Sequence, residues 1–236
     1  MFTQSARYYD AIYSFKDYAR DAERVHALIQ QYKQSAGSTL LDVACGTGAH
    51  IPYLRQHYMP EGLDLDEGML AVARQRHPDI PFHQADMVHF DLGRAFDVVL
   101  CMFSSIGYVK TVPRLQSALQ SLSRHVKPGG LVLVEPWLTP ENYRGGGVHA
   151  LFVDQPDLKI ARMNLSRQED RVSIMDFHYL VGTPEGITHF TERHELGLFT
   201  PGEYREAFEA AGLEVVYQEP ARERERGIYV GRRPLA

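Results

Sequence analysis

The chain has 236 residues, of which 44% are hydrophobic, and this length and composition suit one α/β domain with an insertion and a substantial core. Its formal net charge of −5 argues against a general binder of nucleic acids or anionic membranes. No apolar run is long enough to span a bilayer, and the N-terminal stretch lacks the hydrophobic region of a signal peptide. The two cysteines, Cys45 and Cys101, favour free thiols over a disulfide, so we expect a cytoplasmic protein.

The first segment of the chain is rich in aromatic residues. Tyr9-Asp10-x-x-Tyr13 places two tyrosines one helical turn apart. These rings could pack a helix against the domain, or they could close over a ligand and exclude water. We favour the second interpretation and expect Tyr13 to be the lid residue. Apolar residues at helical spacing predict a helix that follows Lys16 and ends near Gln34. We therefore expect residues 1–38 to form an N-terminal helical lid.

The stretch 39–50 reads as a buried strand, a Gly-x-Gly turn and the start of a helix. Asp42 precedes the turn, and Gly46 and Gly48 lie in it. Glycines allow the backbone to approach a ligand closely, and the free N–H groups of a first helical turn face that ligand. This stretch predicts a nucleotide-type pocket.

Acidic residues follow the next two strands as well. Asp64 ends the second strand, sixteen residues beyond Gly48, where an acid can bind both hydroxyls of a ribose. Asp86 follows the third strand, 81–84. The dinucleotide pattern Gly-x-Gly-x-x-Gly is absent, so the expected ligand is an adenosine without a pyrophosphate.

Strands and helices alternate from Thr39 to Val134, which is typical of a doubly wound parallel sheet. The expected helices are 49–57, 67–76 and 112–126, and the fourth and fifth strands are 96–101 and 131–134. Ligands of such sheets bind outside the carboxyl ends of the strands. This rule directs attention to the loops 102–108 and 135–137.

Period-two alternation dominates the following segment, 148–198. Three alternating runs, 159–167, 173–179 and 189–196, predict an antiparallel meander, which could wall the substrate pocket or form a dimer face. A helix near 201–211 and strands near 213–218 and 227–231 would then complete a seven-stranded, mostly parallel sheet. On this basis 39–147 and 199–236 form the main domain, and 148–198 are an insertion.

Several residues outside the glycine turn allow two interpretations. Eleven histidines are present, but their spacing predicts no metal site, and His178 could line the pocket or belong to a solvated strand face. Trp137 could be core or a pocket wall. The charges of the run 222–225 alternate and could neutralise one another on an exposed edge, whereas Arg226 could present its guanidinium to a diphosphate.

The pattern Asp42-x-x-Cys45-Gly46-Thr47-Gly48, followed by Asp64 and by Asp86-Met87, resembles the cofactor site of class I S-adenosylmethionine methyltransferases. The resemblance implies a Rossmann-like fold with S-adenosylmethionine as cofactor; a nucleotide-type fold that has lost its ligand is the alternative. It also implies contacts from the motif acid and glycines to methionine, from Asp64 to ribose, and from Met69 and Asp86-Met87 to adenine. The expected cofactor-binding set is Tyr13, Asp42, Ala44, Gly46, Gly48, Asp64, Leu65, Met69, Asp86, Met87 and Met102.

Three segments, 41–48, 102–108 and 134–137, are similar to the nucleotide-amino-sugar N,N-dimethyltransferases, which complete desosamine- and mycaminose-type sugars on a TDP carrier. This resemblance runs over nearly the whole chain, from Tyr9 to Gly231. It implies that Tyr108 lies beside the acceptor amine and that Arg226 binds the phosphates of the sugar nucleotide. Leu138-Thr139 and the run 222–225 depart from the family pattern on the substrate side, so the sugar is left open.

The expected activity is therefore in-line methyl transfer to the amine of a small molecule, a nucleotide-linked amino sugar being favoured. Such transfer requires a neutral amine in line with the methyl group and the exclusion of water. We expect Tyr108, assisted by Tyr13 and Ser105, to position the amine, because a tyrosine with a pKa of about 10 is a weak base. Trp137, His178 and Arg226 are the expected substrate-binding residues. We expect no bound metal and no nucleic acid or membrane as a partner. A homodimer is possible. Methylation of an amino acid, polyamine or hydroxylated metabolite, or cofactor binding by a non-catalytic regulator, are the alternatives.

Overall fold

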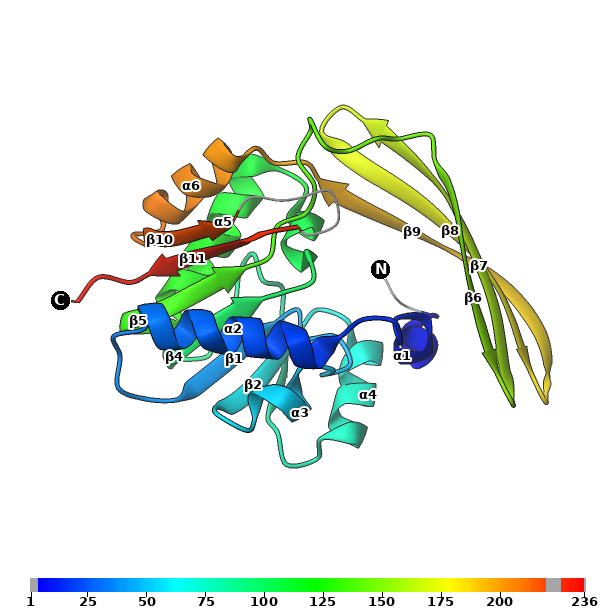
Figure 1. The fold of residues 1–236 in the computed structure, drawn as a ribbon, viewed down its shortest axis with the longest axis horizontal. Coiled ribbons are helices and arrows are strands. Elements are labelled where there is room, and N and C mark those ends of the chain that lie inside the picture. The colour runs from blue at the N-terminus through cyan, green and yellow to red at the C-terminus, as the bar shows by residue number, and fades with distance from the viewer. Residues whose placement is uncertain (1–3, 220–225, 236) are drawn as a thin grey trace.

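A computed structural model describes residues 4–219 and 226–235 of the chain, and the run 222–225 lies outside them. Figure 1 shows a helix-covered main sheet and a second sheet beside it. The main sheet has seven strands in the order β10-β11-β5-β4-β1-β2-β3. The bounds are β1 (Thr39–Val43), β2 (Met59–Asp64), β3 (Phe82–Gln84), β4 (Phe96–Cys101), β5 (Val126–Val134), β10 (Glu214–Glu219) and β11 (Ile228–Arg232).

Strands β1 to β5 pair in parallel, and β11 is antiparallel to both β5 and β10. The expected seven-stranded, mostly parallel sheet is therefore confirmed. The strand order switches direction at β1: the chain continues from β1 to β2 on one side, and β4 later pairs with β1 on the other side. Ligands of open α/β sheets bind outside the carboxyl ends of the strands at such a point.

The helices cover both faces of this sheet. They are α1 (Tyr9–Ile12), α2 (Tyr18–Tyr32), α3 (Ile51–Leu54), α4 (Glu67–Arg76), α5 (Val112–Arg124) and α6 (Pro201–Ala210), with 3-10 turns η1 (Ala6–Tyr8) and η2 (Ser105–Val109). Helix α2 begins where Asp17 accepts a hydrogen bond from the backbone N–H of Arg20. Helix α6 begins with a reciprocal capping box between Thr200 and Glu203.

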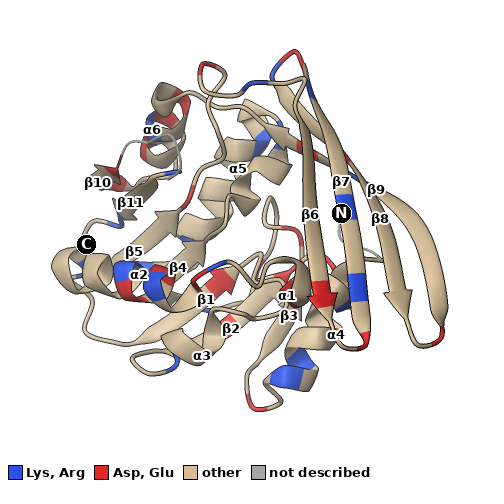
Figure 2. Ribbon diagram, turned by 45° about the vertical axis from the view of Figure 1, so that its right-hand side comes forward, with Lys and Arg blue, Asp and Glu red and all other residues tan. Residues whose placement is uncertain are grey.

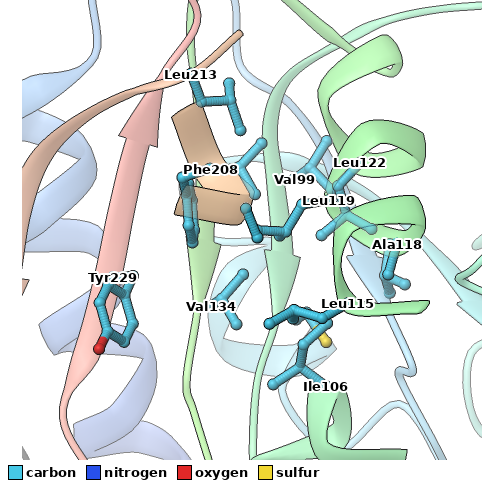
Figure 3. Close-up of a cluster of buried hydrophobic side chains, with 14 of the residues drawn as sticks. Val99, Ile106, Leu115, Ala118, Leu119, Leu122, Val134, Phe208, Leu213 and Tyr229 are labelled. Atoms are coloured by element: carbon cyan, nitrogen blue, oxygen red, sulfur yellow. The ribbon is translucent and has the colours of Figure 1, made fainter. Parts of the chain in front are cut away.

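Two apolar clusters fill the space between sheet and helices. One places α2 against β1, β4, β5 and β11, and the other places α5 and α6 on the opposite face. Figure 3 shows the second cluster, in which Leu119 and Leu122 of α5 and Phe208 of α6 converge on Val99 and Val134. Strand β4 is buried at every position, as a central strand of a doubly wound sheet should be.

The segment after β5 forms an antiparallel four-stranded sheet in the order β6-β7-β8-β9. Its strands are β6 (Val148–Gln155), β7 (Leu158–Glu169), β8 (Val172–Thr183) and β9 (Gly186–Gly197). One face packs on α1 through a cluster that contains Ile12, Phe177 and Tyr179. The meander was predicted, but β6 was not, because apolar residues at 150–153 give it no period-two alternation.

Two predicted elements of the main domain differ from the structure by more than two residues at one end. The helix expected over 49–57 is only Ile51–Leu54, and its neighbours are turns. Strand β5 begins at Val126 instead of Leu131, because Pro128-Gly129-Gly130 lies inside a strand irregularity: β4 pairs Phe96 with Val126 and then Val98 with Leu131. Pro-Gly-Gly therefore forms a bulge here and not a turn before the strand.

Charged residues of both signs are mixed on two of the helices. Figure 2 shows Lys and Arg beside Asp and Glu on both α2 and α6. In residues 4–219 and 226–235, no helix is both long enough and apolar enough to cross a membrane.

Candidate active site

The turn after β1 has an unusual backbone. Ala44, Gly46 and Gly48 have φ of 59°, 57° and 73°, in the left-handed region that favours glycine. A Cβ at Gly46 would meet nothing within 4 Å, so backbone conformation and not space calls for glycine there. Ala44 adopts this conformation with a side chain, a strain typical of functional sites.

Asp64 connects the loops that follow β1 and β2. Its Oδ2 accepts a hydrogen bond from the backbone N–H of Gly46 at 2.8 Å, and its Oδ1 accepts one from Asp66 at 2.9 Å. Burial raises the pKa of this carboxyl, and the backbone hydrogen bonds partly offset the rise. The carboxylate is thus held at the C-terminal end of β2, beside the glycine turn.

A cavity of about 990 Å³ of empty space, part of it open to solvent, lies outside the carboxyl ends of β1 to β4. Nine of the residues predicted from the sequence line it: Ala44, Gly46, Asp64, Leu65, Met69, Asp86, Met87, Ser105 and Tyr108. Met69 is fixed by α4, which Asp66 caps by accepting a hydrogen bond from the Met69 N–H. The structure therefore brings the loops of four strands to one pocket.

A smaller cavity lies on the other side of the glycine turn, and Asp42 and Met102 line it together with Ala44, Gly46 and Ser105. Asp42 is 1% exposed, and its Oδ2 has no hydrogen-bond partner among residues 4–219 and 226–235. Burial raises the pKa of Asp42 to about 6, with His50 opposing the rise and Asp64 adding to it. A buried carboxylate with an unused oxygen suits a cationic ligand group.

Tyr9 was not predicted as a site residue, yet it lines both cavities. Tyr13 packs behind it, with ring centroids 4.6 Å apart, and meets Phe103 edge-on at 5.4 Å. The Tyr9-x-x-x-Tyr13 spacing already placed both rings on one side of a helix, so this spacing was the signal for Tyr9.

Three predicted residues line none of the cavities of the site: Gly48, His178, and Tyr13, which packs behind Tyr9. Gly48 is at the back of the turn, where its carbonyl oxygen is 3.2 Å from Nε2 of His77. His178 is exposed and stacks on His189, on the face of the meander opposite to Phe177 and Tyr179. The structure does not bring His178 to the site, because the period-two alternation of β8 directs it outward.

The loop after β4 forms the wall opposite the glycine turn. Phe103, Ser104 and Lys110 have φ of 53°, 60° and 64°, so both ends of η2 are strained. Within this loop, the Tyr108 hydroxyl lies 2.6 Å from Nδ1 of His194, which comes from β9 of the meander. Burial raises the pKa of Tyr108 well above its ordinary value, so the phenol keeps its proton. Sequence reasoning missed His194, because no local signal brings β9 to η2.

Arg226 and Trp137 line a third cavity beside this loop. The Arg226 guanidinium lies 4.3 Å from the ring centroid of Trp137 and 5.5 Å from that of Phe103. Its Nη1 donates a hydrogen bond to Oγ of Ser104 at 2.9 Å. Burial lowers the pKa of Arg226, and the nearby carboxylate of Glu135 opposes this lowering. The arrangement presents a half-buried cation held by a hydroxyl and aromatic faces.

No group of three or more His, Cys, Asp and Glu side chains is placed to hold a metal ion within the described ranges, 4–219 and 226–235.

Comparison with known proteins identifies the class of enzyme to which this chain belongs. The family model described as "Methyltransferase domain" matches residues 40–130, the part that holds β1 to β4 and the glycine turn. Together with the sheet and the pocket at its carboxyl edge, this match defines a class I S-adenosylmethionine-dependent methyltransferase.

Relatives of known activity narrow the class. The chain is 43% identical over 230 residues to a dTDP-3-amino-3,6-dideoxy-alpha-D-glucopyranose N,N-dimethyltransferase of Streptomyces fradiae, covering 96% of this chain and 89% of the relative. The chain belongs to the family of dTDP-amino-sugar N,N-dimethyltransferases.

Solved structures agree with this assignment. The crystal structure of Streptomyces venezuelae DesVI matches with a TM-score of 0.86 at 40% identity, over 95% of this chain and 97% of that one. A structure of CalS10, an amino pentose methyltransferase of Micromonospora echinaspora with S-adenosylmethionine bound, matches with a TM-score of 0.84 at 36% identity, over 95% and 96% of the two chains.

Proposed function

We propose that this enzyme transfers methyl groups from S-adenosylmethionine to the amino group of a dTDP-linked amino deoxysugar. The observation that carries the substrate class is Arg226, whose half-buried guanidinium lies between Trp137 and Phe103 beside the methyl-transfer loop. A guanidinium pairs well with a diphosphate, and a neighbouring aromatic face suits a nucleobase. The activities of the relatives support the same substrate class.

The residues of the first two cavities fit the cofactor. Asp64 would accept hydrogen bonds from the ribose hydroxyls, Met69 and the Asp86-Met87 pair would flank the adenine, and Asp42 would pair with the methionine ammonium. The fit is chemical: Oδ2 of Asp42 has no hydrogen-bond partner among the described residues and suits a cation, and the amino acid end of the cofactor has one. When bound, S-adenosylmethionine supplies a methyl group already activated by its sulfonium.

The remaining task of the protein is to orient the substrate amine relative to the methyl group. Tyr108 and Ser105 line the cofactor cavity from the acceptor side, where they would hold the substrate amine in line with the methyl group. Orientation of this kind accounts for about 7–11 kcal/mol of a barrier in favourable cases. Tyr108 keeps its proton, so it positions the amine and does not serve as a base.

The N-terminal elements would close this site. The side chain of Asp10, on α1, accepts a hydrogen bond from Oγ1 of Thr47 in the glycine turn at 2.8 Å and forms an ion pair with Arg76 of α4. These contacts hold Tyr9 over the two cavities and Tyr13 against Phe103. We propose that α1 is a lid that excludes water from the transfer site.

The direct test is methyl transfer from labelled S-adenosylmethionine to a panel of dTDP-amino sugars, with the free amino sugars, amino acids and polyamines as comparison acceptors. Turnover should require the nucleotide. Arg226→Ala should raise KM for the nucleotide sugar with little change in cofactor affinity, because the guanidinium contacts the substrate and not the cofactor. Arg55→Ala is the matched control, since Arg55 forms an exposed ion pair with Asp79 away from the site.

Equal turnover of free and nucleotide-linked sugars would contradict the phosphate-binding role of Arg226. Turnover of an amino acid, a polyamine or a hydroxylated metabolite, with none on any nucleotide sugar, would replace the substrate class while leaving the methyltransferase assignment intact.

A second copy of this chain is the occupant that we propose for the outer face of the meander. Val148, Phe152 and Ile187 are 74%, 70% and 75% exposed, and Met163 and Leu165 share that face with Val148 through register pairing. Several large exposed apolar side chains gathered on one sheet face, here interspersed with polar and charged residues such as His178 and Arg193, suit the interface of a two-fold dimer. Sedimentation velocity should show a dimer that Leu165→Lys converts to a monomer, with Met59→Lys, an equally exposed apolar site elsewhere, as control. A wild-type monomer would contradict this interface.

We further propose that the enzyme works in the cytoplasm. Cys45 and Cys101 are both buried free thiols, as is usual for proteins of a reducing compartment.

A further inference from the structure

Three polar side chains from two elements form a connected line behind the acceptor side of the site. The Tyr108 hydroxyl of η2 meets Nδ1 of His194 at 2.6 Å, and Nε2 of His194 lies 3.8 Å from Oε2 of Glu192. His194 and Glu192 are both inward-facing residues of β9, 2% and 8% exposed. Of these three residues, only Tyr108 has a role in the proposed function.

Glu192 is held as a carboxylate. Its Oε1 accepts hydrogen bonds from the backbone N–H groups of Gln4 and Ser5 at 2.8 and 3.0 Å, and its Oε2 accepts one from the Ser5 hydroxyl at 2.5 Å. Burial by itself would raise the pKa of Glu192, but the interaction with His194 and the hydrogen bonds from Ser5 and Gln4 outweigh it and lower the pKa to about 2. At 3.8 Å the two groups are beyond hydrogen-bond distance, but the negative charge of the carboxylate favours the tautomer of His194 that carries its proton on the facing nitrogen, Nε2.

His194 is held as a neutral ring. Burial lowers its pKa, and Arg162 of β7 opposes protonation, while Glu192 favours it. The other neighbours are the aromatic ring of Phe177, which meets His194 edge-on at 5.1 Å, and the Tyr108 phenol, which keeps its proton. A neutral imidazole has one donor and one acceptor nitrogen. With Nε2–H directed at Glu192, Nδ1 is the acceptor, and the Tyr108 hydroxyl is the donor.

The direction of this hydrogen bond matters for methyl transfer. An amine is methylated through its nitrogen lone pair, so a hydroxyl that donates its proton to that lone pair blocks the reaction. A hydroxyl oxygen that accepts an amine N–H instead orients the amine and leaves its lone pair free.

We propose that neutral His194 is a positioning residue that fixes the direction of the hydrogen bond made by the Tyr108 hydroxyl, which we call the polarity of Tyr108. By accepting the hydroxyl proton at Nδ1, it leaves the phenol oxygen as an acceptor for the N–H of the substrate amine. This role rests on the proposed function, since it concerns an amine acceptor beside Tyr108. Protonation of His194 removes the acceptor, and the Tyr108 proton then turns toward the amine.

The test compares two substitutions of His194, each in the wild-type and in the Tyr108→Phe background. His194→Asn retains an amide oxygen that accepts a hydrogen bond but does not titrate, and His194→Leu removes the acceptor. His194→Leu should lower kcat about tenfold with unchanged cofactor affinity, and His194→Asn should stay within about threefold of wild type. In the Tyr108→Phe background, His194→Leu should change kcat less than about twofold, because no hydroxyl is left to direct.

The pH dependence separates this role from packing. As the pH falls below the ordinary range of histidine titration, the activity of wild type should fall relative to that of His194→Asn, because only the histidine gains a proton. The titration of the substrate amine is common to both enzymes and cancels in the ratio. His57→Asn, the same change at an exposed histidine outside the meander, should leave kcat and its pH profile unchanged.

Equal losses of kcat in His194→Leu and His194→Asn would show that His194 only contributes packing. The same conclusion would follow if His194→Leu lowered kcat as much in the Tyr108→Phe background as in the wild-type background. Nitrogen-15 NMR of the S-adenosylmethionine complex gives a readout that needs no acceptor substrate: the Nε2–H tautomer is expected at neutral pH, and the Nδ1–H tautomer would overturn the proposal. Absence of turnover on nucleotide sugars would contradict the proposed function, whereas the tautomer would still decide the polarity of Tyr108.

Discussion

Asp42 offers a quantitative test of the cofactor site, because its carboxylate is buried without a hydrogen-bond partner at Oδ2 among the described residues. Its pKa is raised from 3.8 to about 6, chiefly by burial. Below the ordinary pKa the group is protonated in both folded and unfolded chains, so it has no pH-dependent effect there. As the pH rises through about 6, the folded protein acquires a buried charge that the unfolded chain carries at no cost.

The difference of about two pKa units corresponds to about 3 kcal/mol of folding free energy lost above pH 6. Asp42→Asn retains the size of the side chain but cannot ionise. The cofactor-free variant should therefore be more stable than wild type by up to about 3 kcal/mol at neutral pH. This gain should shrink as the pH falls from about 6 to 3.8 and vanish below that.

Urea denaturation of the two cofactor-free proteins between pH 4 and about pH 8 measures this difference directly. Other titrating carboxyls are common to both proteins and cancel. S-adenosylmethionine should bind Asp42→Asn more weakly, and its affinity for wild type should rise with pH through about 6, because the ionised carboxylate pairs with the ligand ammonium. A variant less stable than wild type at neutral pH, or a stability difference that does not change with pH, would refute this reasoning.

Three further substitutions test the packing around the site. Gly62→Ala should destabilise the protein by about 1–3 kcal/mol in urea denaturation, since a Cβ there would lie 2.5 Å from Phe82 and 2.8 Å from Sγ of Cys45; unchanged stability would contradict the close packing of β2. Thr47→Val removes the hydroxyl that donates to Asp10 at nearly constant volume, and should cost about 1 kcal/mol and weaken cofactor binding measured by calorimetry; full affinity would argue against the lid. Ile12→Ala, at a 1% exposed position against the meander, should cost about 2–5 kcal/mol, and a smaller loss in the same denaturation assay would show that α1 is loosely docked.

Local patterns in the sequence were sufficient to predict the main sheet and the cofactor side of the site. Asp42 and Asp64 lie at the C-terminal ends of β1 and β2, Asp86 follows β3, and the carboxyl ends of parallel strands meet at one edge of a sheet. Position in the chain therefore implies position in space for these residues. The left-handed turn at Gly46 follows from the same local logic, since glycine is the residue that adopts such a backbone at no steric cost.

Local patterns were insufficient where apolar residues occupy both sides of an element or where packing overrides propensity. Strand β6 has no alternation, because its outer face exposes Val148 and Phe152 while its inner face packs toward α1. Pro128-Gly129-Gly130 has the composition of a turn, yet the neighbouring strand β4 accommodates it as a bulge in β5.

The acceptor side of the site was decided by tertiary structure. Tyr108 and His194 are 86 residues apart, and their 2.6 Å contact exists because the meander folds back against η2. The same alternation that directs His194 inward directs His178 outward, a choice set by which face of the sheet packs on α1. The sequence by itself determined the fold, the cofactor and the carboxylates that line the predicted cofactor pocket, because these depend on short-range order along parallel strands. The partner of Tyr108 depends on packing between the two sheets, and the partners of Arg226 depend on which loops of the main sheet lie beside the start of β11; no spacing of residues along the chain records either contact.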